Sequence, residues 1–212
     1  KWFHFTGITP ALGDNVAECC LEAVKTAKKL GVTVSCDLNY RKKLWSREKA
    51  RSVMTELVQY VDIVIANEED AADVFGIRAA ESDVTKGELS EEGYKDVAKQ
   101  LMDKFSLKGV AITLRESYSA SDNGWSAMFY DGNDYYFSRK YKVHIVDRVG
   151  GGDSFGGGLI YAMLNGYAPQ DAVEFAVAAS CLKHTIVGDF NHMTLKEVQN
   201  LAKGDASGRV QR

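Results

Sequence analysis

Three consecutive glycines followed by an aspartate, at residues 150–153, form the stretch of this sequence best suited to chemistry. Glycine lets a backbone approach a ligand closely, and apolar residues then recur at helical spacing, at Phe155, Leu159 and Met163. The pattern predicts a loop that leads into a helix. A helix N-terminus offers unpaired N–H groups and the positive end of a dipole, which attract phosphate or another anion. Asp153 would repel that anion unless it has a chemical role beside it.

A structural alternative for the same stretch is a glycine-rich turn whose acidic residue favours the start of a helix. A second glycine run, at residues 156–158, lies inside the helical pattern, where each glycine costs about 1 kcal/mol relative to alanine. We therefore expect the first turns of this helix to pack closely against a sheet or a ligand.

Composition excludes several classes of protein. The chain has 212 residues, 45% of them hydrophobic, which predicts a single domain over residues 1–212 with one substantial core. With 26 basic and 29 acidic residues, the formal charge is −3, and no basic stripe predicts nucleic-acid binding. We expect neither a membrane span nor a signal peptide. The four cysteines show no C-x-x-C pattern and indicate buried, reduced thiols in a cytoplasmic protein.

The elements that would position the glycine-rich stretch alternate between strand and helix. Apolar runs predict strands at residues 2–8, 32–36, 61–66 and 109–114, and amphipathic patterns predict helices at 14–30, 46–58, 67–75, 90–105, 169–186 and 195–202. Asp14, Ser46 and Asn67 are the expected helix caps, and residues 77–89 are expected to form a surface loop. Alternation with period two at residues 125–130 and 135–141 predicts an antiparallel hairpin.

Alternating strands and helices predict a parallel sheet, and such sheets bind ligands outside the carboxyl ends of their strands. Polar clusters follow those ends here, at residues 6–7, 37–41, 67–70 and from Arg115 onward. The agreement between these clusters and the strand ends predicts an active site.

The spacing of the glycines and of their neighbours argues against several known glycine-containing motifs. The glycines at 150–158 do not complete G-x-G-x-x-G, and no lysine followed by serine or threonine closes a Walker A loop. Protein-kinase signatures are absent, the histidines sit in no G-x-S-x-G context that could activate Ser154, and we expect them to be structural. Phosphoryl transfer is left: backbone N–H groups at residues 150–153 would hold the transferring charge, while Asp153 accepts the proton of the acceptor hydroxyl.

Residues 147–158 resemble the C-terminal signature of the ribokinase-like (pfkB) carbohydrate kinases, and residues 67–70 resemble that family's N-x-x-E element. Residues 37–45, 188–191 and 204–212 resemble one subgroup, the 2-keto-3-deoxygluconate kinases. The resemblance implies a three-layer α/β/α fold with a mainly parallel sheet and a C-terminal antiparallel hairpin. It also implies that the chain corresponds to the C-terminal two-thirds or so of that fold, without the N-terminal strands and lid.

The activity implied by this resemblance is the ATP-dependent phosphorylation of 2-keto-3-deoxygluconate to its 6-phosphate. Asp153 would be the catalytic base and contact the substrate, and Gly150, Gly151 and Gly152 would form the anion hole. Arg41 would bind the sugar acid's carboxylate with its planar, two-pronged guanidinium, the alternative being a surface arginine after a strand. The other implied contacts are Asp189 with substrate, Asn67, Thr113, Leu114, Arg115, Gly124, Gly150 and Gly152 with nucleotide, and Asp70 indirectly with magnesium.

ATP and Mg²⁺ are the implied cofactors, and a monovalent cation and a homo-oligomer are left open. The sequence departs from the family pattern at Arg148 (usually threonine), Gly151 (alanine), Asp70 (glutamate) and Glu116 (glycine), and residues 117–123 resemble an insertion. The alternatives are another pfkB sugar or nucleoside kinase, and a catalytically silent fragment that binds nucleotide or a partner subunit.

Overall fold

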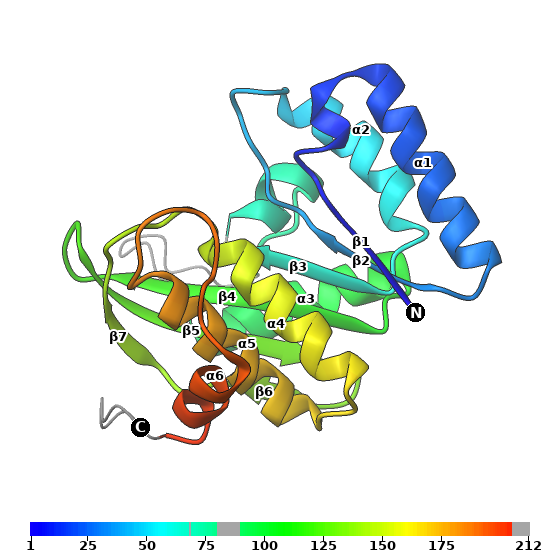
Figure 1. Cartoon of the computed structure of the whole chain (residues 1–212). Helices are drawn as coiled ribbons and strands as arrows, with labels where there is room; N and C mark the ends of the chain where they lie inside the picture. Colours follow the sequence, from blue (N-terminus) through cyan, green and yellow to red (C-terminus); the bar gives the residue numbers. More distant parts are fainter. Residues whose placement is uncertain (68, 80–89, 205–212) are drawn as a thin grey trace. The chain divides into compact units, whose positions relative to one another are not determined.

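The computed structural model describes residues 1–67, 69–79 and 90–204, and Figure 1 shows how the chain runs through its helices and strands. The chain divides into two compact units. The first comprises residues 1–113 and 128–135, and the second comprises residues 114–127 and 136–212. The expected single domain over residues 1–212 stays a prediction, and the resemblance at residues 205–212 lies outside the described residues.

Parallel strands form the sheet of the first unit: β1 (Trp2–Thr6), β2 (Thr33–Asp37), β3 (Ile63–Asn67) and the first part of β4 (Gly109–Ser117). Val34, Val64 and Val110, from three neighbouring strands, have no exposed surface. Continuous burial of this kind is typical of parallel strands covered on both faces. The predicted buried parallel strands are therefore confirmed.

Three α-helices belong to the described part of the first unit, α1 (Asp14–Lys29), α2 (Arg47–Val58) and α3 (Glu91–Phe105), together with the short helical turns η1 (Pro10–Leu12) and η2 (Ala71–Phe75). The predicted cap at Ser46 is confirmed, because its hydroxyl accepts a hydrogen bond from the Lys49 amide at 3.2 Å. The predicted cap at Asp14 is wrong. Gly13 occupies the cap position, and the Asp14 carboxylate pairs with Lys49 Nζ at 2.7 Å.

The second unit holds the glycine-rich helix α4 (Gly151–Leu164), followed by α5 (Pro169–Lys183) and α6 (Leu195–Ala202). Close packing of α4 is confirmed at Gly158, where a Cβ would lie 3.1 Å from the Cα of Ala176 on α5. The partner is a helix rather than a sheet or a ligand. At Gly157 a Cβ would meet no protein atom within 4 Å, so close packing of that residue against a ligand stays a prediction.

The remaining strands are β5 (Asp122–Tyr130), β6 (Tyr135–Phe137) and β7 (Tyr141–His144), and the hydrogen-bonded order is β1-β2-β3-β4-β5-β6 with β7 on β5. The predicted hairpin is confirmed, and at its turn Asp131 Oδ1 accepts hydrogen bonds from the Asn133 and Asp134 amides at 2.8 Å. Its second strand is interrupted, however, and β7 pairs antiparallel with β5. A further hairpin between β4 and β5, with the Tyr118 amide donating to the Asp122 carbonyl at 3.0 Å, was not predicted.

Two expectations from composition can be compared with the described residues. None of their helices is long and apolar enough to cross a membrane. All four cysteines are free thiols, and Cys20, Cys36 and Cys181 are buried as expected, whereas Cys19 is exposed. The expectation that every thiol is buried is therefore wrong for Cys19.

Candidate active site

The polar residues that follow β1, β2 and β3 meet at one edge of the first unit's sheet. Asn39 Nδ2 donates to Thr6 Oγ1 at 3.0 Å, which joins the ends of β1 and β2. The amides of Tyr40 and Asn67 donate to Oδ1 and Oδ2 of Asp70, each at 3.1 Å, which joins the segments after β2 and β3. The predicted convergence of polar clusters at the carboxyl ends of these strands is confirmed.

Asp70 is the central group of this cluster. It is buried, and its two oxygens each accept a backbone N–H from a different segment. A buried carboxylate needs such partners. Asp70 therefore links the loop after β2 to the segment after β3. Sequence reasoning missed this role, and the only available signal was an acid directly after a strand end. Its magnesium contact stays a prediction, and the described residues contain no cluster of three or more acidic, histidine or cysteine side chains that could hold a metal.

Two of the residues predicted to bind nucleotide lie side by side at the ends of β3 and β4, because Asn67 is the register partner of Thr113. The side chain of Asn67 caps the segment that follows β3, accepting from the Glu69 and Asp70 amides at 2.9 Å. The side chain of Asn67 thus makes the hydrogen bonds of a cap, but Asp70 occupies the cap position of the helical residues Ala71–Phe75, so the predicted cap position is wrong. The amide group of Asn67 is consequently fixed at the strand end.

Arg41 lies in the loop after β2 and is exposed. Its Nη1 donates to the carbonyl of Tyr40 at 2.9 Å, and its own carbonyl accepts from the Leu44 amide at 2.9 Å. No ion pair links Arg41 to an acid in the part of the chain that the structure describes. The remaining guanidinium N–H groups can therefore face an anionic ligand.

In the second unit, Gly150 and the N-terminus of α4 form a turn, and its binding of an anion stays a prediction. Gly150 has a left-handed backbone with φ of +79°, and the Gly151 amide donates to the Arg148 carbonyl at 3.3 Å. Within the described residues, nothing accepts a hydrogen bond from the amides of Gly152 and Asp153. Asp153 itself is exposed in the first turn. The turn thus presents two backbone donors beside a carboxylate.

Asp147 holds this turn against the loop that contains Gly188 and Asp189. Its Oδ1 accepts from the Val149 amide at 3.0 Å and its Oδ2 from the Gly188 amide at 2.9 Å. These two backbone hydrogen bonds lower the pKa of Asp147, so its carboxylate stays ionised. Sequence reasoning included Asp147 in a motif without assigning it a role.

A buried polar pair supports α4 from the side of α5. Ser180 Oγ donates to the Gly151 carbonyl at 2.8 Å, and His184 Nδ1 donates to the Ser180 carbonyl at 2.7 Å. The His184 ring leaves no room for alanine at residue 151, because a Cβ there would lie 2.6 Å from ring atoms. Burial lowers the pKa of His184, so the ring is held neutral. The departure of Gly151 from the family pattern follows from this ring.

The residues near the predicted nucleotide loop that differ from the family pattern are also held by hydrogen bonds. Glu116 accepts hydrogen bonds from Lys140 and from the Tyr118 hydroxyl, and these bonds lower the pKa of its carboxyl group. Arg148 Nη2 donates to Asn123 Oδ1 at 3.2 Å and to the Ala120 carbonyl. The apparent insertion is therefore the tip of the β4–β5 hairpin, and Arg148 ties that tip to the glycine-rich turn.

The predicted site residues fall in both units. Those in the first unit are Arg41, Asn67, Asp70 and Thr113, and those in the second are Leu114, Arg115, Gly124, Gly150, Gly151, Gly152, Asp153 and Asp189. The structure brings together members of each group within their own unit.

Comparison with known proteins identifies the family. Residues 1–193 match the pfkB family of carbohydrate kinases. A 2-dehydro-3-deoxygalactonokinase from Haloferax volcanii is 30% identical over 97% of this chain and 58% of its own length. A 2-dehydro-3-deoxygluconokinase from Bacillus subtilis is 30% identical over 92% of this chain and 53% of its own length. This chain belongs to the pfkB family of carbohydrate kinases.

Solved structures give the same result for the fold. The crystal structure of 2-dehydro-3-deoxygluconokinase from Thermotoga maritima has a TM-score of 0.90 and 50% identity, and the match covers 96% of this chain and 60% of that one. A putative ribokinase II from E. coli, at 21% identity and a TM-score of 0.75, shares the fold. The predicted ribokinase-like α/β fold is confirmed. The chain spans a little over half the length of the curated relatives that it matches.

Proposed function

We propose that the protein to which this chain belongs is an ATP-dependent kinase for 2-keto-3-deoxygluconate, and that this chain carries its phosphoryl-transfer turn. The observation behind the proposal is the α4 N-terminus, where the Gly152 and Asp153 amides lie beside the exposed Asp153 carboxylate. Phosphoryl transfer needs donors for the charge on the transferring group and an acceptor for the proton of the attacking hydroxyl. The turn supplies both on adjacent residues.

In this mechanism Asp153 accepts the proton of the substrate's hydroxyl group. A carboxylate is a weak base at neutral pH. A weak base suffices when the transition state is loose, because the hydroxyl proton then leaves late. Gly150 and Gly151 set the position of the donors, and Asp189 contacts the substrate next to them.

The phosphate groups of ATP fit a turn of this kind, because a helix N-terminus offers unpaired N–H groups. Residue 150 must be glycine, because its backbone is left-handed and the Asp189 carbonyl lies against it. The nucleotide contacts in our proposal are those that the family resemblance implies, at Asn67, Thr113, Leu114, Arg115 and Gly124. Mg²⁺ usually binds through one or two carboxylates together with substrate phosphates, so a large cluster of acids is not required. A related fold, the E. coli putative ribokinase II, was solved in complex with ATP and Mg²⁺.

Arg41 selects the substrate in this proposal. Its exposed, planar guanidinium can hold a carboxylate through two parallel hydrogen bonds, which a neutral sugar cannot accept in the same way. The names of the relatives from Bacillus subtilis and Thermoproteus tenax, both 2-dehydro-3-deoxygluconokinases, support an acidic sugar. The free thiols of the described residues are in keeping with a cytoplasmic enzyme.

The first experiment is a coupled ADP-release assay of the whole protein. We expect Asp153→Asn to lower kcat by about 10²–10⁴-fold while ATP binding is retained. Asp14→Asn is the matched control, because Asp14 is also an exposed acid in the first turn of a helix. Turnover that is equal in Asp153→Asn and the unmodified protein would remove Asp153 from the mechanism.

The second experiment tests substrate choice. Arg41→Ala should raise KM for 2-keto-3-deoxygluconate at least tenfold more than KM for fructose, and Arg41→Lys should give an intermediate loss for the acid. Equal losses for both substrates would contradict the carboxylate contact. They would favour another sugar kinase of the family, such as the 6-phosphofructokinase of Thermoanaerobacterium thermosaccharolyticum that is 25% identical to this chain.

A silent nucleotide-binding fragment is the second candidate, and it is favoured by the chain's coverage of 58% or less of the curated relatives. The same assay on the 212-residue chain, compared with the whole protein, separates the two candidates. ATP binding without ADP release by the whole protein would favour the silent function.

A further inference from the structure

Lys183, the last residue of α5, is a buried cation that none of the proposed ligand contacts uses. Its side chain has no exposed surface, although a lysine is almost never fully buried unless it is paired. Its Nζ donates to the Ile186 carbonyl at 3.4 Å, and no ion pair links it to an acid in the part of the chain that the structure describes. An ammonium group has three donors, so one long hydrogen bond compensates poorly for its loss of water.

Helix stability alone does not account for this side chain. A cation in the last turn of a helix interacts favourably with the carbonyl groups and the dipole there. That benefit is available at the surface, as at the exposed Lys29 in the last turn of α1. An apolar side chain of similar length, such as methionine, would avoid the cost of burying a charge. The burial of Lys183 therefore indicates a role beyond stability.

The carbonyl that accepts this hydrogen bond begins the loop at residues 186–189, which holds the glycine-rich turn. In this loop the Gly188 amide donates to Asp147 Oδ2 at 2.9 Å. The carbonyl oxygen of the next residue, Asp189, lies against the backbone of Gly150. A shift of the loop would consequently move both supports of the turn.

Lys183 also acts on the Asp147 carboxylate through its charge. Hydrogen bonds from the Val149 and Gly188 amides are the main cause of the lowered pKa of Asp147, and the positive charge of Lys183 lowers that pKa further. The peptide next to Lys183 is tied to the same segment, because the His184 carbonyl accepts from the Asp147 amide at 3.3 Å. The lysine thus supports both sides of the contact between loop and turn.

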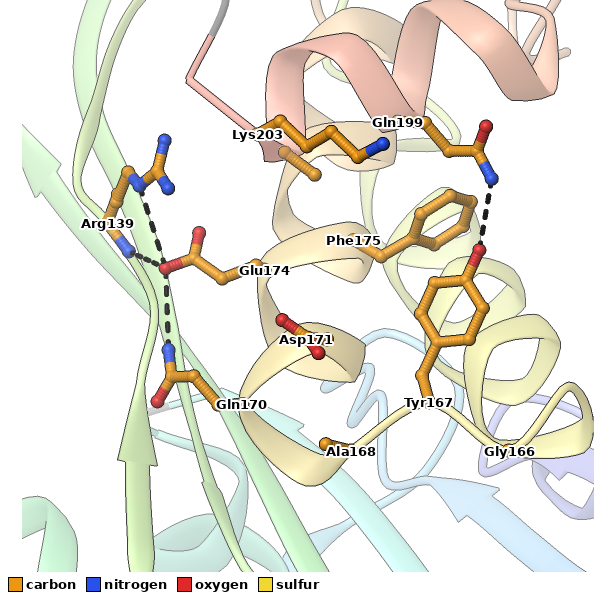
Figure 2. A pocket seen from close by; sticks show the side chains of 11 residues that line it. Arg139, Gly166, Tyr167, Ala168, Gln170, Asp171, Glu174, Phe175, Gln199 and Lys203 are labelled. Carbon is orange, nitrogen blue, oxygen red and sulfur yellow. Dashed lines mark hydrogen bonds and ion pairs between the residues drawn. The ribbon is translucent and has the colours of Figure 1, made fainter.

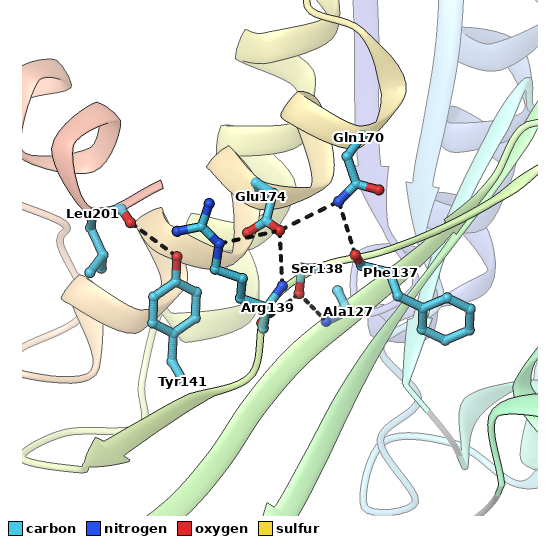
Figure 3. Close-up of polar contacts among 8 residues, drawn as sticks. All are labelled: Ala127, Phe137, Ser138, Arg139, Tyr141, Gln170, Glu174 and Leu201. Carbon is cyan, nitrogen blue, oxygen red and sulfur yellow. Dashed lines mark hydrogen bonds and ion pairs between the residues drawn. The ribbon is translucent and has the colours of Figure 1, made fainter. Parts of the chain in front are cut away.

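The other end of α5 is held in place, so its last residue is a fixed support for the loop. Near the start of the helix, Glu174 Oε1 accepts from the Arg139 amide at 3.0 Å (Figure 3). In the cavity that Figure 2 shows, Gln199 of α6 donates to the Tyr167 hydroxyl at 3.1 Å, two residues before α5 begins. These contacts join α5 to the segment before β7 and to α6.

We propose that Lys183 is a positioning residue for phosphoryl transfer: its buried ammonium group fixes the 186–189 loop, and through that loop it holds the glycine-rich turn and Asp153 in the geometry of the reaction. Its effect on turnover rests on the proposed kinase function, whereas its effect on the loop does not. The donors of the turn act on charge that develops in the transition state, so loss of Lys183 lowers kcat more than it changes KM for ATP.

Lys183→Met in the whole protein removes the ammonium group and keeps a side chain of similar length. We expect kcat in the coupled ADP-release assay to fall about tenfold or more, with KM for ATP changed less than about threefold. Lys29→Met is the matched control, an exposed lysine in the last turn of a helix, and should leave kcat unchanged. A lysine that served stability alone would lower the free energy of unfolding and leave kcat of the folded variant unchanged, and that result would overturn the proposal.

Hydrogen exchange measures the loop without any turnover. Peptides that contain Val149 and Gly188, whose amides both donate to Asp147, should exchange about tenfold faster or more in Lys183→Met, while peptides from α1 should exchange at unchanged rates. Unchanged exchange at both amides would overturn the proposal, whatever the assay shows. If the unmodified protein releases no ADP, faster exchange would still support the positioning of the turn, and only the kinase function would fail.

Lys183→Gln keeps the test decisive if Lys183→Met does not fold. Its amide group can donate to the Ile186 carbonyl but carries no charge, so kcat should fall about threefold or more, with faster exchange at Gly188. Combined with Asp147→Asn, it should lower kcat by less than the product of the two separate losses, because both residues support the same turn. Unmodified kcat and exchange in Lys183→Gln, or losses that multiply, would contradict the proposal.

Discussion

The backbone of Gly150 lies directly against the carbonyl oxygen of Asp189: a Cβ on Gly150 would come within 2.0 Å of that oxygen. Gly150 also has a φ of +79°, which disfavours any residue with a side chain. Two independent requirements therefore demand glycine at the entrance of α4. Through this contact the loop at residues 188–189 sets the position of the glycine-rich turn.

We expect Gly150→Ala to destabilise the protein by about 2 kcal/mol or more, since left-handed strain and steric overlap each cost about 1–3 kcal/mol. The free energy of unfolding from urea titration measures this loss. Gly166→Ala is the matched control, because Gly166 has a φ of +72° but open space around it. A loss in Gly150→Ala no larger than that in Gly166→Ala would show that the Asp189 contact is unimportant.

Asp147→Asn should lower turnover of the whole protein about tenfold or more without unfolding it. The substituted amide has one oxygen and one N–H₂ group, so one of the Val149 and Gly188 amides loses its acceptor and faces a donor. The turn and the 188–189 loop then separate. Steady-state kinetics and far-UV circular dichroism measure the two effects. Asp134→Asn changes an exposed charge in a hairpin turn and should be neutral, whereas wild-type turnover in Asp147→Asn would contradict a positioning role.

Two neighbouring glycines of α4 should respond oppositely to alanine. Gly157→Ala should stabilise the protein by about 0.5–1 kcal/mol, because the helix gains propensity and a Cβ meets nothing within 4 Å. Gly158→Ala should be destabilising, since its Cβ would lie 3.1 Å from the Ala176 Cα. Urea titrations of both variants measure the difference. Equal effects of the two substitutions would contradict the packing of α4 on α5.

His184 should make stability depend on pH. Burial lowers its folded pKa below the ordinary value of 6.5. Below pH 6.5 the unfolded chain therefore binds a proton that the folded chain does not. The contribution of neutral His184 to the free energy of unfolding is therefore complete above about pH 6.5. It is lost as the pH falls toward the folded pKa, and the free energy of unfolding then falls by at most about 1.4 kcal/mol per pH unit.

The measurement is the free energy of unfolding at pH 7.5, 6.5 and 5.5, for the protein and for His184→Gln. The variant should show a smaller fall between pH 6.5 and 5.5 than the unmodified protein. Identical pH profiles would assign the fall to other groups.

Local patterns were sufficient for most elements of the fold. The serine before an amphipathic run located the start of α2, since a hydroxyl that caps a helix needs only residues within the first turn. Asp14 failed as a cap because it is already the first residue of the helix, after the extended Gly13, and its carboxylate pairs with Lys49 of another helix. The β4–β5 hairpin was missed because its tip, at residues 118–121, has no glycine to indicate a turn.

By itself the sequence determined the family, the glycine-rich turn and the candidate base, because these depend on residues a few positions apart. Tertiary structure decided which groups hold that turn in place. Asp147 reaches Gly188, and Ser180 reaches Gly151, across stretches of chain whose spacing carries no signal. It also decided that Gly158 is required for packing while Gly157 is not, because only the position of α5 distinguishes two adjacent residues of the same type.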